Sequence, residues 1–261
     1  MHFDLSDQYH HRLSIIHNLD PRVKVVVTLI YVLAVGLTPE GEWWAFFALW
    51  IFLMLANLAS GLGPTFSLRR SYIAAPFMLI AIPVLFTTPG SDIVELPFVG
   101  WTISDVGLVR FLSILLRSWL AVQGAILLTA TTRAADLFWA LEALRMPKSL
   151  VATIRFMYRY LFVLGDEALR LIRARSSRSA RLPGNPRPSV IWEGKVAGLM
   201  VGSLFIRSLE RSERVYAAML SRGYDGRMRS MTDFHTTKAD WMVILLVMLF
   251  IGAIEGFAHL G

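Results

Sequence analysis

Long apolar stretches that carry almost no charge constrain the fold of this chain more than any other feature of its sequence. Of the 261 residues, 55% are hydrophobic and only 17% are charged, and the mean hydropathy is +0.54. Soluble domains usually carry about 25% charged residues. We therefore expect much of the apolar excess to lie in lipid instead of in a soluble core.

A membrane-spanning helix needs roughly 20 mostly apolar residues to cross about 30 Å of hydrocarbon. Five stretches are predicted as spans on this basis. They cover residues 23–37, 43–59, 72–86, a segment between 106 and 130, and 239–257. The sequence thus predicts an all-α integral membrane protein with about five transmembrane helices.

Positive charge is concentrated in one part of the chain. Nineteen of the 26 Lys and Arg residues lie within residues 133–238, together with nine acidic residues. The predicted loops 38–42 and 87–105 contain no Lys or Arg. Because basic loops face the cytoplasm, we expect the N-terminus and residues 133–238 to be cytoplasmic. The C-terminus is then expected outside a multi-pass protein of the cell (inner) membrane.

The predicted organisation has three parts: a membrane domain of four spans (1–132), a cytoplasmic helical coupling domain (133–238) and a final span (239–261). The coupling domain is predicted to hold helices over residues 135–144, 149–179 and 189–220. The Pro/Gly-rich stretch 182–188 predicts a turn or linker, and Gly223 a helix end. The apolar parts of the two long helices are short or interrupted by Arg, which predicts helices at the membrane surface or packed on each other.

Three glycines stand four residues apart in the second long helix, at Gly194, Gly198 and Gly202. This spacing places them on one helix face, which allows another backbone to approach closely. Packing within this chain and packing against a partner remain alternatives.

The sequence shows little that indicates catalysis. It has no Cys and no glycine-rich nucleotide loop. His2, His10, His11 and His17 match no standard metal-ligand spacing. We predict no catalytic residue, no metal site, no cofactor bound by this chain and no nucleic-acid partner.

Two arginines fall within the fourth predicted span. Arg110 and Arg117 are seven residues apart and so share a helix face. Charges within a span are costly and are candidates for a transport path. Alternatively, Arg110 extends toward the membrane surface and pairs with Asp105 or Glu95.

Two tripeptides near the ends of the long helices are the clearest candidates for a functional site. Ala174-Arg175-Ser176 and Ser221-Arg222-Gly223 each place small residues on both sides of an Arg. Small neighbours leave a guanidinium group accessible, and its fixed fork of donors matches carboxylates. Docking into acidic grooves of a partner and an ordinary solvated basic face are both compatible with this pattern.

At these residues the chain resembles the transmembrane (T) components of energy-coupling-factor transporters, most closely the cobalt-type T subunit, over nearly its whole length. Residues 19–24 (LDPRVK) resemble the motif before the first span. Residues 158–162 (YRYLF), with Asp166 and Glu167, resemble the first coupling helix. Residues 174–176 and 218–224 (AMLSRGY) resemble the two coupling signatures, with Ser176 where Gly is often found.

The resemblance implies a non-catalytic subunit of an ABC importer. Such a subunit joins two cytoplasmic ABC ATPase subunits, which use the ATP, to a small membrane substrate-binding (S) subunit. By this resemblance, Arg175 and Arg222 would each enter a groove of one ATPase. Cobalt is the expected substrate, and nickel, biotin or another vitamin are the alternatives.

Two further hypotheses come from other functional classes. A membrane-embedded enzyme acting on a lipid or small polar substrate would need acidic or His residues within its spans, where the sequence offers Glu255 beside the two arginines. A basic scaffold for anionic lipid or nucleic acid would bind with a steep dependence on salt.

Overall fold

The computed structural model describes residues 14–63, 65–74, 76, 80–89, 91–96, 101–178, 189–226 and 237–260. The chain divides into two compact units. The first, termed the bundle unit, is built on residues 7–140 and 232–261. The second, termed the arm unit, is built on residues 141–231.

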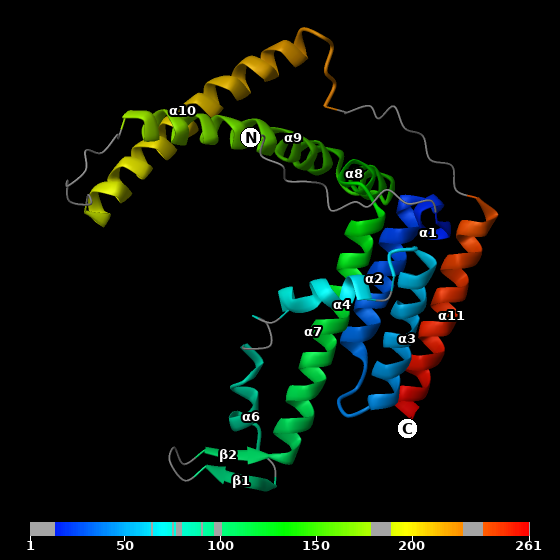
Figure 1. Cartoon of the computed structure of the whole chain (residues 1–261). Helices are drawn as coiled ribbons and strands as arrows, with labels where there is room; N and C mark the ends of the chain where they lie inside the picture. Colours follow the sequence, from blue (N-terminus) through cyan, green and yellow to red (C-terminus); the bar gives the residue numbers. More distant parts are fainter. Residues whose placement is uncertain are drawn as a thin grey trace. The chain divides into compact units, whose positions relative to one another are not determined.

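Helices make up most of the described part of both units (Figure 1). In chain order, the helical elements before the first strand are α1 (Ile15–Asn18), α2 (Pro21–Leu37), α3 (Trp43–Ala59), α4 (Thr65–Arg70), the 3₁₀ helix η1 (Ser71–Ala74) and α6 (Val84–Thr87). Those after the second strand are α7 (Asp105–Thr131), α8 (Ala134–Ala143), α9 (Lys148–Arg178), α10 (Val190–Leu220) and α11 (Lys238–Leu260).

The first long helix starts where its sequence provides both a cap and a stiff first residue. The Asp20 carboxylate accepts a hydrogen bond from the Arg22 backbone N–H at 2.8 Å. Pro21 follows as the first helical residue, where its missing N–H costs nothing. The helix ends at Leu37, just before Thr38-Pro39. The predicted spans 23–37 and 43–59 therefore coincide with α2 and α3.

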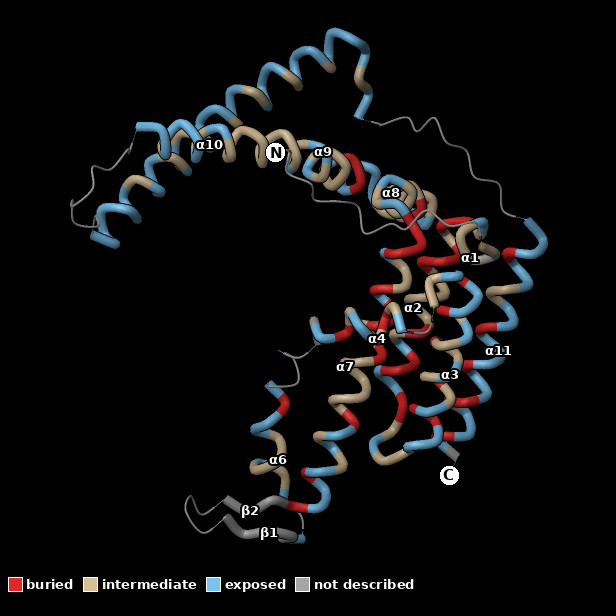
Figure 2. Tube along the Cα trace, viewed as in Figure 1, coloured by how far each residue is buried: buried red, intermediate tan, exposed pale blue. Residues whose placement is uncertain are grey.

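Four helices form the core of the bundle unit. In Figure 1, α2, α3, α7 and α11 run beside one another, and each contacts at least two of the others. Val35 of α2, Leu49 of α3 and Leu120 of α7 are fully buried, and Val247 of α11 joins the same cluster. Figure 2 shows buried residues at intervals along each helix, as expected for helices with one inward face.

The opposite faces of these helices remain apolar. Phe47 is 60% exposed, Leu246 is 62% exposed and Leu249 is 66% exposed. By length and composition, α7 and α11 can each cross a membrane, and α3 is a shorter apolar helix. An exposed apolar surface of this extent is unusual for a water-soluble monomer. It fits the predicted location of these helices in lipid.

The third predicted span differs from the prediction. Where one helix was expected over residues 72–86, the described residues form η1, helical positions at 76, 80 and 81, a turn at Ile82-Pro83 and the short helix α6. Pro83 lacks a backbone N–H, so the helix cannot run unbroken through it. Residues 75 and 77–79 lie outside the described part of the chain.

A two-stranded hairpin is an addition to the predicted all-α fold. β1 (Asp92–Leu96) pairs antiparallel with β2 (Trp101–Ser104), with Leu96 opposite Trp101. The hairpin occupies the predicted loop 87–105. Ser104 then caps α7 by accepting a hydrogen bond from the Gly107 N–H at 2.9 Å.

The arm unit contains the two longest helices of the described chain, α9 and α10. Their bounds agree with the predicted helices 149–179 and 189–220 to within one residue at each end. Figure 2 shows α10 mostly exposed and α9 divided between intermediate and exposed residues, and α10 has no buried residue. The predicted linker 182–188 lies outside the described residues.

The end of α8 carries a strained residue. Arg145 has φ +68°, and the N–H of Met146 donates to Leu141 O while that of Arg145 donates to Glu142 O, both at 3.2 Å. This is a Schellman helix end, at which glycine is usual. A side chain in this conformation costs roughly 1–2 kcal/mol.

We therefore expect Arg145→Gly to raise the free energy of unfolding of the arm unit by about 1 kcal/mol. Thermal unfolding in mild detergent measures the gain. Arg145→Ala removes the charge but keeps the Cβ atom, so it serves as the control and should bring no comparable gain. Equal stabilisation by both variants would contradict the strain argument.

Candidate functional site

The candidate site is distributed along the two long helices of the arm unit. In Figure 1, α9 (green) and α10 (yellow to orange) cross, and the two helices contact each other. Phe156, Met157 and Tyr160 of α9, with Tyr216 and Met219 of α10, line an apolar groove of about 760 Å³. The groove is the part of the arm unit where the two apolar faces meet.

A charged bridge also joins α9 to α10. The Glu167 carboxylate accepts from Arg170 on its own helix and from Arg207 Nη1 of α10 at 3.1 Å. The hydrogen bond from Arg170, followed by that from Arg207, lowers the pKa of Glu167 below 4.5. The bridge is therefore intact at neutral pH and is lost only in acid, as the pH falls through the lowered pKa. Because both arginines are exposed, its contribution to stability stays below about 1 kcal/mol.

Arg175 lies in the last turn of α9. Its Cζ atom is 6.0 Å from the centre of the Trp192 ring, in the first turn of α10. Sequence analysis expected a guanidinium left accessible by small neighbours, and Ala174 and Ser176 are indeed exposed. Arg175 itself is half-buried.

Arg222 is positioned by the helix end that follows α10. Gly223 has φ +78°, its N–H donates to Leu220 O, and the N–H of Tyr224 donates to Met219 O, both at 3.0 Å. These are the two hydrogen bonds of a Schellman motif, which requires Gly223 in the left-handed conformation. The prediction that the helix stops at Gly223 is confirmed. Arg222 is thereby held exposed beside the negative end of the helix dipole.

The two arginines lie at opposite ends of α10. Arg175 stacks near Trp192 at its beginning, and Arg222 follows its end. At 1.5 Å per residue, roughly 45 Å of helix separates Trp192 from Arg222. The geometry suits two separate contacts on a partner, and it does not bring the two guanidinium groups into one site.

The three glycines of α10 face open space within this chain. A Cβ atom added at Gly194, Gly198 or Gly202 would meet no atom within 4 Å. In the part of the chain that the structure describes, no helix packs on this face. Of the two alternatives for these glycines, the described contacts give no support to packing within the chain.

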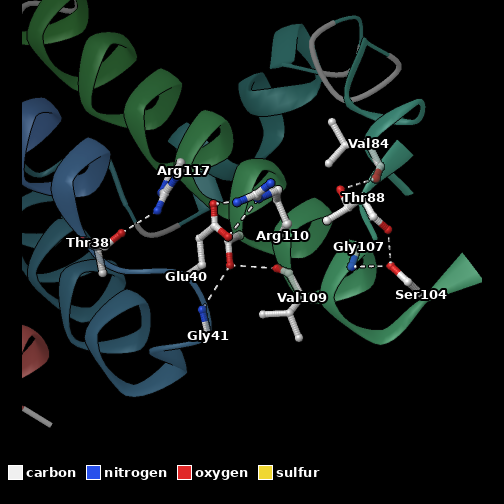
Figure 3. A network of polar contacts seen from close by, with 11 residues as sticks. Thr38, Glu40, Gly41, Val84, Thr88, Ser104, Gly107, Val109, Arg110 and Arg117 are labelled. Atoms are coloured by element: carbon white, nitrogen blue, oxygen red, sulfur yellow. Dashed lines mark hydrogen bonds and ion pairs between the residues drawn. The ribbon is translucent and has the colours of Figure 1, made fainter. Parts of the chain in front are cut away.

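Sequence reasoning missed the partners of the two intramembrane arginines, which Figure 3 shows. Arg110 forms an ion pair with Glu40 at 3.0 Å and not with Asp105, while the side chain of Glu95, the other expected partner, lies outside the described part of the chain. Arg117 Nη2 donates to Thr38 O at 2.6 Å, and Thr38 Oγ1 donates to Glu255 Oε1 at 2.8 Å. Arg117 thus joins α7 to the end of α2, and Arg110 joins α7 to the loop that follows α2. The predicted loop 38–42 contains two glutamates and no basic residue, and this could have indicated an acidic partner for Arg110.

The family model for CbiQ, described as cobalt transport protein, matches residues 13–233. The energy-coupling factor transporter transmembrane protein EcfT of Clostridium kluyveri is 27% identical over 255 residues, covering 91% of this chain and 90% of the relative. An uncharacterized protein of Methanocaldococcus jannaschii is 29% identical over 85% of this chain and 76% of its own length.

One relative is named as a fusion. A putative fused cobalt transport protein, CbiMQ, of Methanocorpusculum labreanum is 27% identical over 172 residues. The match covers 64% of this chain and 27% of the relative.

Proposed function

Because this chain belongs to the CbiQ family of cobalt transport proteins, we propose that it is the energy-coupling transmembrane subunit of an ABC-type importer. In this role it links two cytoplasmic ATPase subunits to a small membrane subunit that binds the substrate. The chain itself catalyses no reaction and binds no cofactor, and the partner subunits use the ATP.

The placement of Arg175 and Arg222 is the observation that carries this proposal. The two side chains stand at opposite ends of one 31-residue helix, each in a tripeptide with small residues on both sides of the Arg. Two identical ATPases present two equivalent grooves, and a subunit that meets both needs two separated contacts. Each guanidinium group supplies a planar fork of donors suited to a carboxylate in such a groove.

The exposed glycine face of α10 suits a second contact. Gly194, Gly198 and Gly202 leave room for the close approach of a helix from the substrate-binding subunit. Placing residues 133–238 in the cytoplasm and the C-terminus outside completes the proposal. The concentration of Lys and Arg in that segment supports this orientation.

We propose cobalt as the transported ion, which agrees with the name of the family and of the fused relative. Nickel, biotin or another vitamin remain the alternatives, since substrate choice resides in the partner subunit.

Affinity purification of the tagged chain in mild detergent tests the proposed function. We expect two ATPase copies and a small membrane protein to co-purify, and ATP hydrolysis in the complex but not in the chain alone. A chain that purifies alone from cells making the whole transporter would contradict the proposal. Activity of the isolated chain on a lipid or polar substrate would instead support the membrane-enzyme hypothesis.

A further inference from the structure

A cation–π contact joins the start of the first long helix to α8. The Cζ atom of Arg22 lies 4.2 Å from the centre of the Trp139 ring. Arg22 Nε is buried and donates to no acceptor among the described residues. The guanidinium therefore lies over the indole ring in a partly dry setting, where such contacts are strongest.

A second contact fastens the same corner. Lys24 is 8% exposed, and its Nζ donates to Thr131 O at 3.2 Å. Thr131 is the last residue of α7, three positions before α8 begins. Asp136, in the first turn of α8, also attracts the Lys24 charge. The first turn of α2 thus holds α8 at its beginning through Lys24 and at its middle through Arg22.

The boundary between the two compact units falls within α8, after Ala140. Beyond that boundary, Glu142 of α8 forms an ion pair with Arg155 of α9 at 3.0 Å. Both side chains are largely covered, at 28% and 15% exposure. Hydrogen bonding along ten residues makes α8 a stiff rod of about 15 Å. One end of this rod is tied to α2 and the other to α9.

We propose that Arg22 and Trp139 are positioning residues that pass displacement of α9, through α8, into the spanning helix α2. This inference rests on the proposed function, because the partner ATPases supply the displacement. It goes further by naming the contact through which the motion enters the membrane bundle. Without that contact, α8 moves relative to α2 when α9 is displaced. α2 then stays in place although ATP is still hydrolysed.

The absence of cysteine from the chain allows a direct test. Leu33→Cys on α2 and Leu249→Cys on α11, both at exposed positions, carry spin labels in the complex purified with its ATPases. Pulsed electron paramagnetic resonance then measures the distance between α2 and α11 with and without ATP. We expect ATP to change the distribution of distances in the reference chain.

Trp139→Leu and Arg22→Gln each remove the cation–π pair. In either variant, the ATP-driven change in the ratio of the two distance populations should fall about tenfold, the factor expected for losing a desolvated cation–π contact. Co-purification of the ATPases and their rate of ATP hydrolysis should be unchanged. Trp139→Phe keeps an aromatic ring beneath the guanidinium and should retain the change.

Arg70→Gln is the matched control, because it removes the same kind of contact, between Arg70 and Phe66 at 4.5 Å, away from α8. It should leave the response to ATP intact. The inference is overturned if the reference chain shows no ATP-dependent change, if Trp139→Leu keeps it, or if Trp139→Leu loses ATPase binding as well. Failure of the reference chain to bind ATPases would instead overturn the proposed function.

Discussion

Reversing the charge at Arg175 and Arg222 together should abolish co-purification of the ATPases while the chain still inserts into membranes. Removing one partner of a desolvated charge pair typically costs about 2–5 kcal/mol. Each glutamate adds repulsion from the acidic groove that the arginine is proposed to enter. Two such losses weaken binding by several orders of magnitude, because each 1.4 kcal/mol corresponds to a factor of ten.

The single variants carry independent information. Because the two arginines lie at opposite ends of α10, their effects on binding should add. Arg175→Glu also removes the contact with Trp192, so its effect should include some local loosening of α9 against α10. Arg222→Glu changes only an exposed side chain at a helix end, which makes it the cleaner of the two.

The pair Arg178→Glu and Arg214→Glu is the control. Arg178 lies in α9 and Arg214 lies in α10, and both are exposed. The total change in charge equals that of the Arg175→Glu/Arg222→Glu chain. If the arm unit binds ATPases through its general positive charge, this pair should dissociate the complex equally well. Retained ATPase binding in the Arg175→Glu/Arg222→Glu chain would rule out the proposed contacts.

Replacing Lys24 by methionine should destabilise the bundle unit by about 3 kcal/mol, within the range for breaking a buried charge interaction. The ammonium group donates to His17 O at 3.0 Å and to Thr131 O at 3.2 Å. Burial disfavours its charge, and the negative charges of Asp136 and Asp20 oppose that penalty. Methionine fills a similar volume but leaves the two carbonyls without this donor and the acidic groups without this cation.

Thermal unfolding of the chain in mild detergent measures this loss, with Lys238→Met as the control. Lys238 is an exposed residue at the start of α11, so its replacement should change the midpoint little. An equal midpoint for both variants would show that Lys24 contributes no more than a surface charge.

Helix ends could be predicted best from the sequence where a proline or glycine follows them. α2 ends at Leu37, just before Thr38-Pro39 and at the predicted end of the first span, and Gly223 follows α10 as predicted. In the predicted third span, apolar composition indicated one helix although Pro83 lies within it. Apolar composition measures affinity for lipid, whereas helix continuity depends on backbone hydrogen bonds that Pro83 cannot make.

For the candidate site, the sequence located Arg175 and Arg222 but not their surroundings. The contact of Arg175 with Trp192 links residues 17 positions apart in different helices, and no local pattern signals it. The same holds for Arg22 and Trp139, or for Arg110 and Glu40, which come together only once the helices pack. Long-range pairs of this kind depend on tertiary geometry, and periodicity carries no information about it.

The glycine face of α10 has a consequence for how genetic variation would act on this protein. Bulkier residues at Gly194, Gly198 or Gly202 encounter no obstacle in the isolated chain, and a helix interior favours alanine over glycine. Alleles carrying such changes would therefore be produced at normal abundance and would pass any screen for folding. If a partner helix packs on this face, as proposed, their defect would surface only in cells that must build the complete importer.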